Sequence, residues 1–106
     1  MQRSDQPELD LELQVEFASY DGKIEGKGKT RTVSPVSVYF FTSGWQQLAE
    51  GQALELRIHG LQRYLFSTTF RTLTGTGIVL RVDAPREQLE GRGGVHAQCT
   101  WARLQR

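Results

Sequence analysis

Cysteine and histidine, the side chains most often used for covalent or metal chemistry, are scarce in this chain. The sequence of 106 residues contains one cysteine, Cys99, and two histidines, His59 and His96. A single cysteine cannot form an internal disulfide, and the spacing of these residues does not supply the three or four ligands of a metal site. We therefore expect a cytoplasmic protein without a bound metal, in which Cys99 is a small core residue.

An excess of positive charge is also absent. Lysine and arginine total 13, and aspartate and glutamate total 12. A chain with so little net charge does not attract a polyanion through its overall field. Binding to nucleic acid would therefore require a local basic patch.

Long hydrophobic runs are missing as well. No run approaches the roughly eighteen apolar residues of a membrane-spanning helix. Near the start, where a signal peptide would be apolar, the sequence carries Asp5, Glu8, Asp10 and Glu12. These features predict a soluble protein without a membrane span that stays in the cytoplasm.

Catalytic patterns are lacking too. No Gly-x-Ser-x-Gly elbow is present, and the acidic residues alternate with apolar ones, as the wet face of a sheet requires. The run from Gly22 to Thr30 ends in Gly-Lys-Thr, but five residues separate Gly22 from Gly28, whereas a phosphate-binding P-loop has four. The sequence therefore disfavours an enzyme and indicates a solvated basic segment at this run.

Glycine and β-prone residues are the features that the chain does have. Eleven glycines are spread along the sequence, with β-branched and aromatic runs between them, which is typical of short strands joined by tight turns. The length suits one domain with a single core. We expect a polar, extended arm over residues 1–8 and a single domain over residues 9–106.

The first half of this domain predicts three strands. Apolar residues alternate with polar ones over residues 11–17 and again over 54–58, which indicates half-buried strands. Ser19–Gly22 has the composition of a turn. Residues 23–32 are expected to form either an edge strand or a long loop. Residues 36–42 are apolar on both faces and predict a central strand, and residues 43–51 predict a loop with one turn.

The second half predicts a hairpin and a final extended segment. Residues 64–73 are rich in Phe and Thr and indicate a strand, residues 74–77 a reversal, and Ile78, Leu80 and Val82 one face of the returning strand. Over residues 95–104, a helix and a strand both stay open, and Gly93-Gly94 with the β-prone residues that follow favours a strand. The expected fold is a small all-β, six- or seven-stranded antiparallel barrel.

One functional alternative comes from the basic residues of such a barrel. Several of them could converge on one face and contact phosphates, with aromatic rings as stacking surfaces for bases. The cations in question are Arg57, Arg71, Arg81, Lys27, Lys29 and Arg31, and the rings are those of Tyr39, Trp45 and Tyr64. This pattern describes an oligonucleotide-binding barrel, which the balanced charge disfavours.

The order of features over residues 9–84 resembles the PilZ domain family of small bacterial β-barrels. The likeness lies in a first strand over residues 11–17, a turn entering the strand at 36–41, and Leu48-Ala49-Glu50-Gly51 before the strand at 54–58. A hairpin that pairs residues 66–72 with 77–82 completes it. The resemblance implies a PilZ-like barrel, and typical members of this family bind cyclic-di-GMP.

The signature residues of the dinucleotide-binding members are incomplete in this chain. The family's Arg-x-x-x-Arg arm is represented by Arg3, but Pro7 stands four residues on, and Glu8 lies nearest to the place of the second arginine. Arginine forks onto phosphate and guanine edges, which neither proline nor glutamate can do. The resemblance therefore implies weaker binding of the dinucleotide by the arm.

The second signature, Asp-x-Ser-x-x-Gly, appears here as Thr32-x-Ser34-x-x-Ser37, so that only the serine matches. By resemblance, Arg3, Thr32, Ser34 and Ser37 are the candidate ligand-binding residues. A lone Ser34 is more simply interpreted as a turn residue that caps its own backbone.

Together these observations predict a non-enzymatic PilZ-like interaction or adaptor module in bacterial cyclic-di-GMP-related signalling, with dinucleotide binding weak or lost. Its expected partner is another bacterial protein, with no cofactor and with cyclic-di-GMP as the candidate ligand. The alternatives are a genuine cyclic-di-GMP receptor with a non-standard site, in which Arg3, Arg31 or Lys29 replaces the missing arginine, and the oligonucleotide-binding barrel.

Overall fold

A computed structural model describes residues 9–10, 12–59, 72–85 and 91–102 of the chain. These residues form seven strands and one short 3₁₀ turn. The elements are β1 (Leu9–Asp10), β2 (Gln14–Ala18), β3 (Glu25–Val33), β4 (Ser37–Thr42), η1 (Trp45–Gln47), β5 (Ala53–His59), β6 (Thr72–Asp83) and β7 (Gly93–Trp101).

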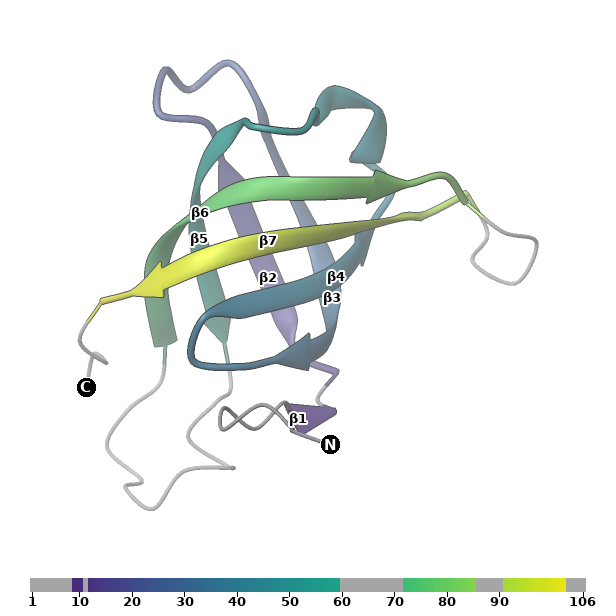
Figure 1. Ribbon diagram of the computed structural model, residues 1–106. Coiled ribbons are helices and arrows are strands. Elements are labelled where there is room, and N and C mark those ends of the chain that lie inside the picture. Colours follow the sequence, from purple (N-terminus) through teal and green to yellow (C-terminus); the bar gives the residue numbers. More distant parts are fainter. Residues whose placement is uncertain (1–8, 11, 60–71, 86–90, 103–106) are drawn as a thin grey trace, which may run out of the picture.

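The strands close into a barrel. Their order is β1-β3-β2-β5-β6-β7-β4, every pairing is antiparallel, and an additional pairing of β3 with β4 closes the ring. In Figure 1, β6, β7 and β4 cross the front of the barrel, while β2, β3 and β5 lie behind them. The all-β antiparallel barrel expected from the sequence is confirmed.

The core fills the inside of this ring. Val15, Phe40, Leu54 and Ile58 are essentially inaccessible to solvent, and the ring of Phe40 lies 5.6 Å from that of Phe17, centroid to centroid. These residues occupy alternate positions of β2, β4 and β5, because successive side chains of a strand point to opposite faces of the sheet. The half-buried strands expected around 15–17 and 54–58 are therefore confirmed, and the strand expected over residues 36–42 forms as β4.

The first strand is shorter than predicted. The alternation suggested one strand over residues 11–17, but β2 begins at Gln14, and Leu11 lies outside the described residues. The Thr30 hydroxyl accepts the Leu13 N–H (2.9 Å), while the Leu13 carbonyl accepts the Thr30 N–H (2.8 Å). Because a side chain takes the place of a backbone carbonyl at this point, the regular ladder is interrupted before Gln14.

Residues 23–32 form neither of the two expected structures. They contribute to β3, which pairs with β2 through residues 25–29 and with β4 through residues 29–33. An edge strand would have one of these neighbours and a loop neither. The prediction of an edge strand or a loop is wrong because closure of the barrel gives β3 a partner on both sides.

The predicted reversal at residues 74–77 is also wrong. These residues lie within β6, where they pair with Leu54–Arg57 of β5, and Gly75–Gly77 also pair with Cys99–Trp101 of β7. Gly75 and Gly77 serve close packing instead of a turn, because a Cβ at Gly75 would lie 2.6 Å from the Trp101 ring. The rest of the predicted strand over residues 64–71 lies outside the described residues.

One residue of β6 departs from the predicted alternation. Ile78 and Leu80 share a face, as predicted, and are 45% and 44% exposed. Val82, expected on the same face, packs against the core because a bulge lies between Val79 and Arg81. By contrast, the loop with one turn before β5 is confirmed as η1. The strand interpretation of residues 95–101 is confirmed by β7, whose Val95, Ala97 and Cys99 point inward.

Candidate functional site on the outer face of β3, β4, β7 and β6

The turn between β3 and β4 holds two of the four predicted site residues together. The Ser34 N–H donates to the Ser37 carbonyl (2.9 Å), and the two serine hydroxyls lie 2.9 Å apart. The Ser34 hydroxyl also accepts the Val36 N–H (3.2 Å), and Ser34 is 6% exposed. Serine hydroxyls commonly stabilise turns by binding nearby backbone in this way, so both side chains are already engaged within the turn.

The other two predicted residues are placed apart from this pair. Thr32 lies on β3, directly opposite Tyr39 of β4. Arg3 lies outside the described residues. The Ser34 carbonyl also accepts the indole N–H of Trp101 (2.9 Å), which fixes the turn to the far end of β7. The structure thus brings Ser34 and Ser37 together and leaves Thr32 beside Tyr39 on the neighbouring strand.

A row of paired residues crosses the four strands β3, β4, β7 and β6, and a bulge lies at each end of it. Thr32 is opposite Tyr39, Tyr39 is opposite His96, and His96 is opposite Arg81. One extra residue is inserted in β3 between Thr30 and Thr32, and another in β6 between Val79 and Arg81. We call the four paired residues, together with the two inserted ones, Arg31 and Leu80, the bulge row.

The bulges change which side chains face outward. Thr30 and Val33 are both buried although three positions separate them, and in a regular strand one of them would face solvent. The same holds for Val79 and Val82 of β6, where Val79 is buried and Val82 packs against the core. A bulge re-aims side chains in this way, and here the extra outward residues are the exposed Arg31 and Leu80.

Tyr39 is the centre of the bulge row. Its hydroxyl donates to Asp83 Oδ2 (2.8 Å), and the Arg81 guanidinium lies over its ring, 5.9 Å from the centroid. Arg81 Nε in turn donates to Asp83 Oδ1 (3.0 Å). Burial, followed by the hydrogen bond to Asp83 and the charge of Asp83, raises the pKa of Tyr39. The phenol is therefore neutral at physiological pH and acts as a fixed donor.

A glycine below the ring makes this position possible. A Cβ at Gly94 of β7 would overlap the hydroxyl end of the Tyr39 ring, and a Cβ at Gly93 would meet the Trp45 ring. The Phe41 ring stands edge-on to Tyr39 at 5.3 Å, centroid to centroid, and this geometry is favourable for aromatic pairs. The aromatic side chains therefore lie close against the backbone of β7 and form a supported surface.

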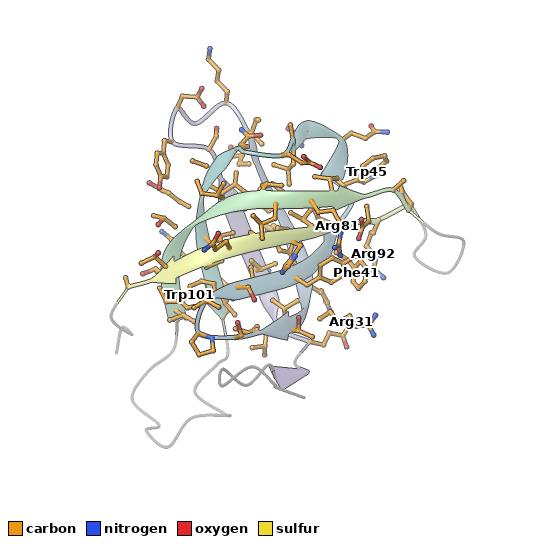
Figure 2. All side chains as sticks on the ribbon, in the orientation of Figure 1. Arg31, Phe41, Trp45, Arg81, Arg92 and Trp101 are labelled. Atoms are coloured by element: carbon orange, nitrogen blue, oxygen red, sulfur yellow. The ribbon has the colours of Figure 1, made fainter. Side chains whose placement is uncertain are left out.

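Basic side chains border this surface. Lys27, Lys29 and Arg31 alternate along the outer side of β3 and are all exposed, and Lys29 lies opposite Phe41. In Figure 2, Arg31, Arg81 and Arg92 lie toward the same side of the view as Phe41, whereas Trp101 lies on the other side. Of the cations that the sequence suggested could converge, three share β3 and a fourth, Arg81, lies over Tyr39.

The remaining cations of that predicted set are elsewhere. Arg57 projects from β5, 4.0 Å from Glu16, and Arg71 lies outside the described residues, as does the predicted stacking residue Tyr64. Arg57 and Glu16 line a groove of about 610 Å³ on the outer side of β2, β3, β5 and β6, which also contains Glu25 and Glu55. None of Thr32, Ser34 and Ser37 lines this groove.

No group of three or more metal-binding side chains is placed to hold an ion within the ranges that the structure describes. In the same ranges, no helix is long and apolar enough to cross a membrane.

Comparison with known proteins found a match among solved structures. No protein-family model and no curated protein matches this sequence. Among solved structures, the inhibitor of motility MotI/DgrA of Bacillus subtilis matches with a TM-score of 0.72 at 13% sequence identity. The match covers 99% of this chain and 45% of that protein, so this chain spans less than half of its length. The likeness supports a PilZ-like fold for the barrel that the described residues form.

Several residues of the site were missed by sequence reasoning. The motif comparison identified the 32–37 turn but gave no role to Asp83, Gly94, His96 or Leu80. Gly93-Gly94 was the only available signal, because consecutive glycines in a strand indicate close approach of another group. Neither bulge had a recognisable local signature, since both depend on which residue stands across the barrel.

Proposed function

We propose that this chain is a non-enzymatic, PilZ-like interaction module in bacterial cyclic-di-GMP-related signalling. It contacts a protein partner through the bulge row and its surroundings, and its affinity for the dinucleotide is weak or lost. The observation that carries this proposal is a fixed aromatic surface flanked by exposed aliphatic side chains, beside a turn whose two serines bind each other.

The turn supports the loss of ligand affinity. Where the family signature has an acid, this chain has Thr32, and where it has glycine, this chain has Ser37. The Ser34 hydroxyl is nearly buried and already bound to Ser37 and Val36. Each missing charge-assisted contact costs about 1.5–3 kcal/mol, so the loss of an arginine and an aspartate lowers affinity by roughly two to four powers of ten.

The outer face supports a protein interface. Leu80 and Ile78, at the β6 end of the bulge row, expose nearly half of their surface. Protein interfaces are enriched in aromatic residues and arginine, and they use apolar side chains at the centre of the contact. Because Asp83 and Gly94 hold Tyr39 in place, little side-chain entropy is lost when a partner binds there.

The structural neighbour supports the regulatory part of this proposal. It is named as an inhibitor of motility, which is a regulatory role. The shared barrel extends over nearly all of this chain. We infer the same class of role for this chain, with a partner defined by its own surface.

Site-specific photocrosslinking tests the proposal. A photoreactive phenylalanine analogue is placed at Leu80 in one variant and at Tyr20 in another, and both are irradiated in cells of a bacterium that encodes the protein. Tyr20 is the matched control, since it is 59% exposed and lies in the β2–β3 turn. We expect a discrete protein adduct from Leu80 that the additional change Ile78→Asp abolishes. Equal adducts from both positions, or none from Leu80, would contradict the proposal.

A second candidate function is a cyclic-di-GMP receptor with a non-standard site. The specific observation in its favour is that the β3 bulge places exposed Arg31 beside Thr32, with Lys29 opposite the Phe41 ring. In this alternative, Arg31 or Lys29 takes the place of the missing arginine. Direct titration with the dinucleotide separates the two functions.

A further inference from the structure

We propose that the basic row of β3, formed by Lys27, Lys29 and Arg31, docks a short acidic segment of the protein partner. This inference rests on the proposed function, which it deepens by naming the chemistry of the partner. Although the total charge of the chain is nearly balanced, three exposed cations follow one another at alternate positions of β3.

The three cations are free to bind an external group. All three are exposed, and within the described ranges no acidic side chain forms an ion pair with any of them. Glu16 stands across from Lys27 on β2, but its carboxylate lies 4.0 Å from Arg57 and 3.4 Å from the His59 ring. Lys27 lines the groove together with Glu16 and Glu25. Lys29, by contrast, lies between Gln14 and Phe41 in the strand register, so it has no acidic neighbour across the strands that the structure describes.

The spacing of the row suits an extended acidic peptide. Alternate residues of a strand lie about 6.6–6.8 Å apart, so Lys27 and Lys29 present their charges at this interval. Arg31 follows at the next alternate position and is also exposed. Carboxylates on alternate residues of an extended segment have the same repeat, so one segment lying along β3 can meet successive cations.

The row is continuous with the surface of the proposed function. Lys29 is opposite Phe41, and in Figure 2 Arg31, Phe41 and Arg81 lie toward the same side of the view. A partner seated on this side can therefore contact the end of the basic row and the bulge row together.

The observations favour a protein over a nucleic acid. Affinity for nucleic acid comes mainly from phosphate contacts, and two acidic residues interrupt the positive surface. Glu25 lies at the start of the basic row, and Asp83 lies beside Tyr39 and Arg81. The exposed Ile78 and Leu80 offer nothing to a phosphate backbone. The hydroxyl end of Tyr39 is also held by Asp83, so this ring is not free to turn toward a base.

NMR titration of the ¹⁵N-labelled full chain tests the inference, with hexaglutamate as the acidic probe and hexathymidylate as the nucleic-acid probe. We expect saturable shifts from hexaglutamate at amides of residues 27–31 and 39–41, decreasing with added salt. The variant Lys27→Gln/Lys29→Gln/Arg31→Gln should weaken binding about tenfold or more, as the loss of three exposed ion pairs allows. Arg57→Gln, on β5 and two strands away from β3, is the matched control and should bind as the wild type does.

Three outcomes would overturn the inference: no saturable shift, equal binding by the triple variant, or tighter binding of hexathymidylate. A titration that fails while the Leu80 crosslink persists removes only the acidic partner and leaves the proposed function in place. Conversely, loss of the Leu80 crosslink contradicts the proposed function whatever the titration shows.

Discussion

The hydrogen bond between Tyr39 and Asp83 gives the sharpest test of the site's construction. Tyr39→Phe removes the hydroxyl but keeps the ring that packs against Gly94 and Phe41. A hydrogen bond to a charged group contributes about 1.5–3 kcal/mol. The Asp83 side chain is 37% exposed, and solvent screening reduces this contribution to about 1 kcal/mol. For a domain of this size, the expected fall in Tm is about 4–8 °C.

The assay is urea denaturation at pH 7 of the four proteins of a double-mutant cycle: wild type, Tyr39→Phe, Asp83→Asn and the double variant. Two residues in contact should show a coupling free energy of about 1 kcal/mol. Tyr20→Phe is the control and should leave stability unchanged, since that exposed ring lies in the β2–β3 turn. Additive effects, with a coupling below about 0.3 kcal/mol, would refute the contact.

The pH dependence of the same cycle has a defined sign. Burial and Asp83 raise the pKa of Tyr39 above its ordinary value of 10.0. The advantage of the wild type over Tyr39→Phe is therefore fully present below pH 10 and is lost as the pH rises through the raised pKa.

Three further predictions concern the core and the packing below the site. Phe40→Ala, at a fully buried position, should destabilise the barrel by about 3–5 kcal/mol in chemical denaturation; a cost under about 1 kcal/mol would contradict the assigned core. Burial raises the pKa of the Cys99 thiol to about 12, so a thiol reagent at pH 8 should label Cys99 only as the protein unfolds, and rapid labelling of the folded protein would count against this burial. Gly94→Ala should cost about 1–3 kcal/mol because the added methyl displaces the Tyr39 ring, and wild-type stability would show that the ring does not lie there.

The parts of the fold that were predicted correctly had apolar side chains at alternate positions. β5 and β7 are examples, because Leu54, Leu56 and Ile58 alternate on one strand and Val95 and Ala97 on the other. In these strands the inward positions carry their own apolar side chains. The alternation within the strand's own sequence is therefore enough to predict it.

β3 could not be recognised in this way. Two of its inward positions are Gly26 and Gly28, and the space that their side chains would fill is taken by the Phe17 ring and by the β4 backbone at Phe41. The apolar signal for this strand thus belongs to its neighbours. A strand whose inner side is filled from elsewhere resembles a loop when its own residues are considered alone.

The error in β6 has a related cause. Gly75 and Gly77 suggested a reversal, but they make room for Trp101, Leu56 and Cys99 from the adjacent strands. Glycine is used both for turns and for close packing, and only the partner strand distinguishes the two. The bulge at Leu80 then turns Val82 toward the core, away from the face that the alternation predicted it to share with Ile78 and Leu80.

The candidate site was predictable only where it is local in sequence. Ser34 and Ser37 are three residues apart, and the motif comparison placed them in one turn, as the structure does. Tyr39 and Asp83 are 44 residues apart, and their contact depends on the order of β4, β7 and β6 around the barrel. That order follows from tertiary pairing and cannot be inferred from spacing.

Isothermal titration of the full chain with cyclic-di-GMP tests whether a PilZ-like barrel is retained here while dinucleotide binding is lost. We expect no saturable binding at micromolar ligand concentrations, because roughly two to four powers of ten in affinity are missing. Micromolar binding that Arg3→Ala and Ser34→Ala each abolish would contradict it and would establish the receptor function instead.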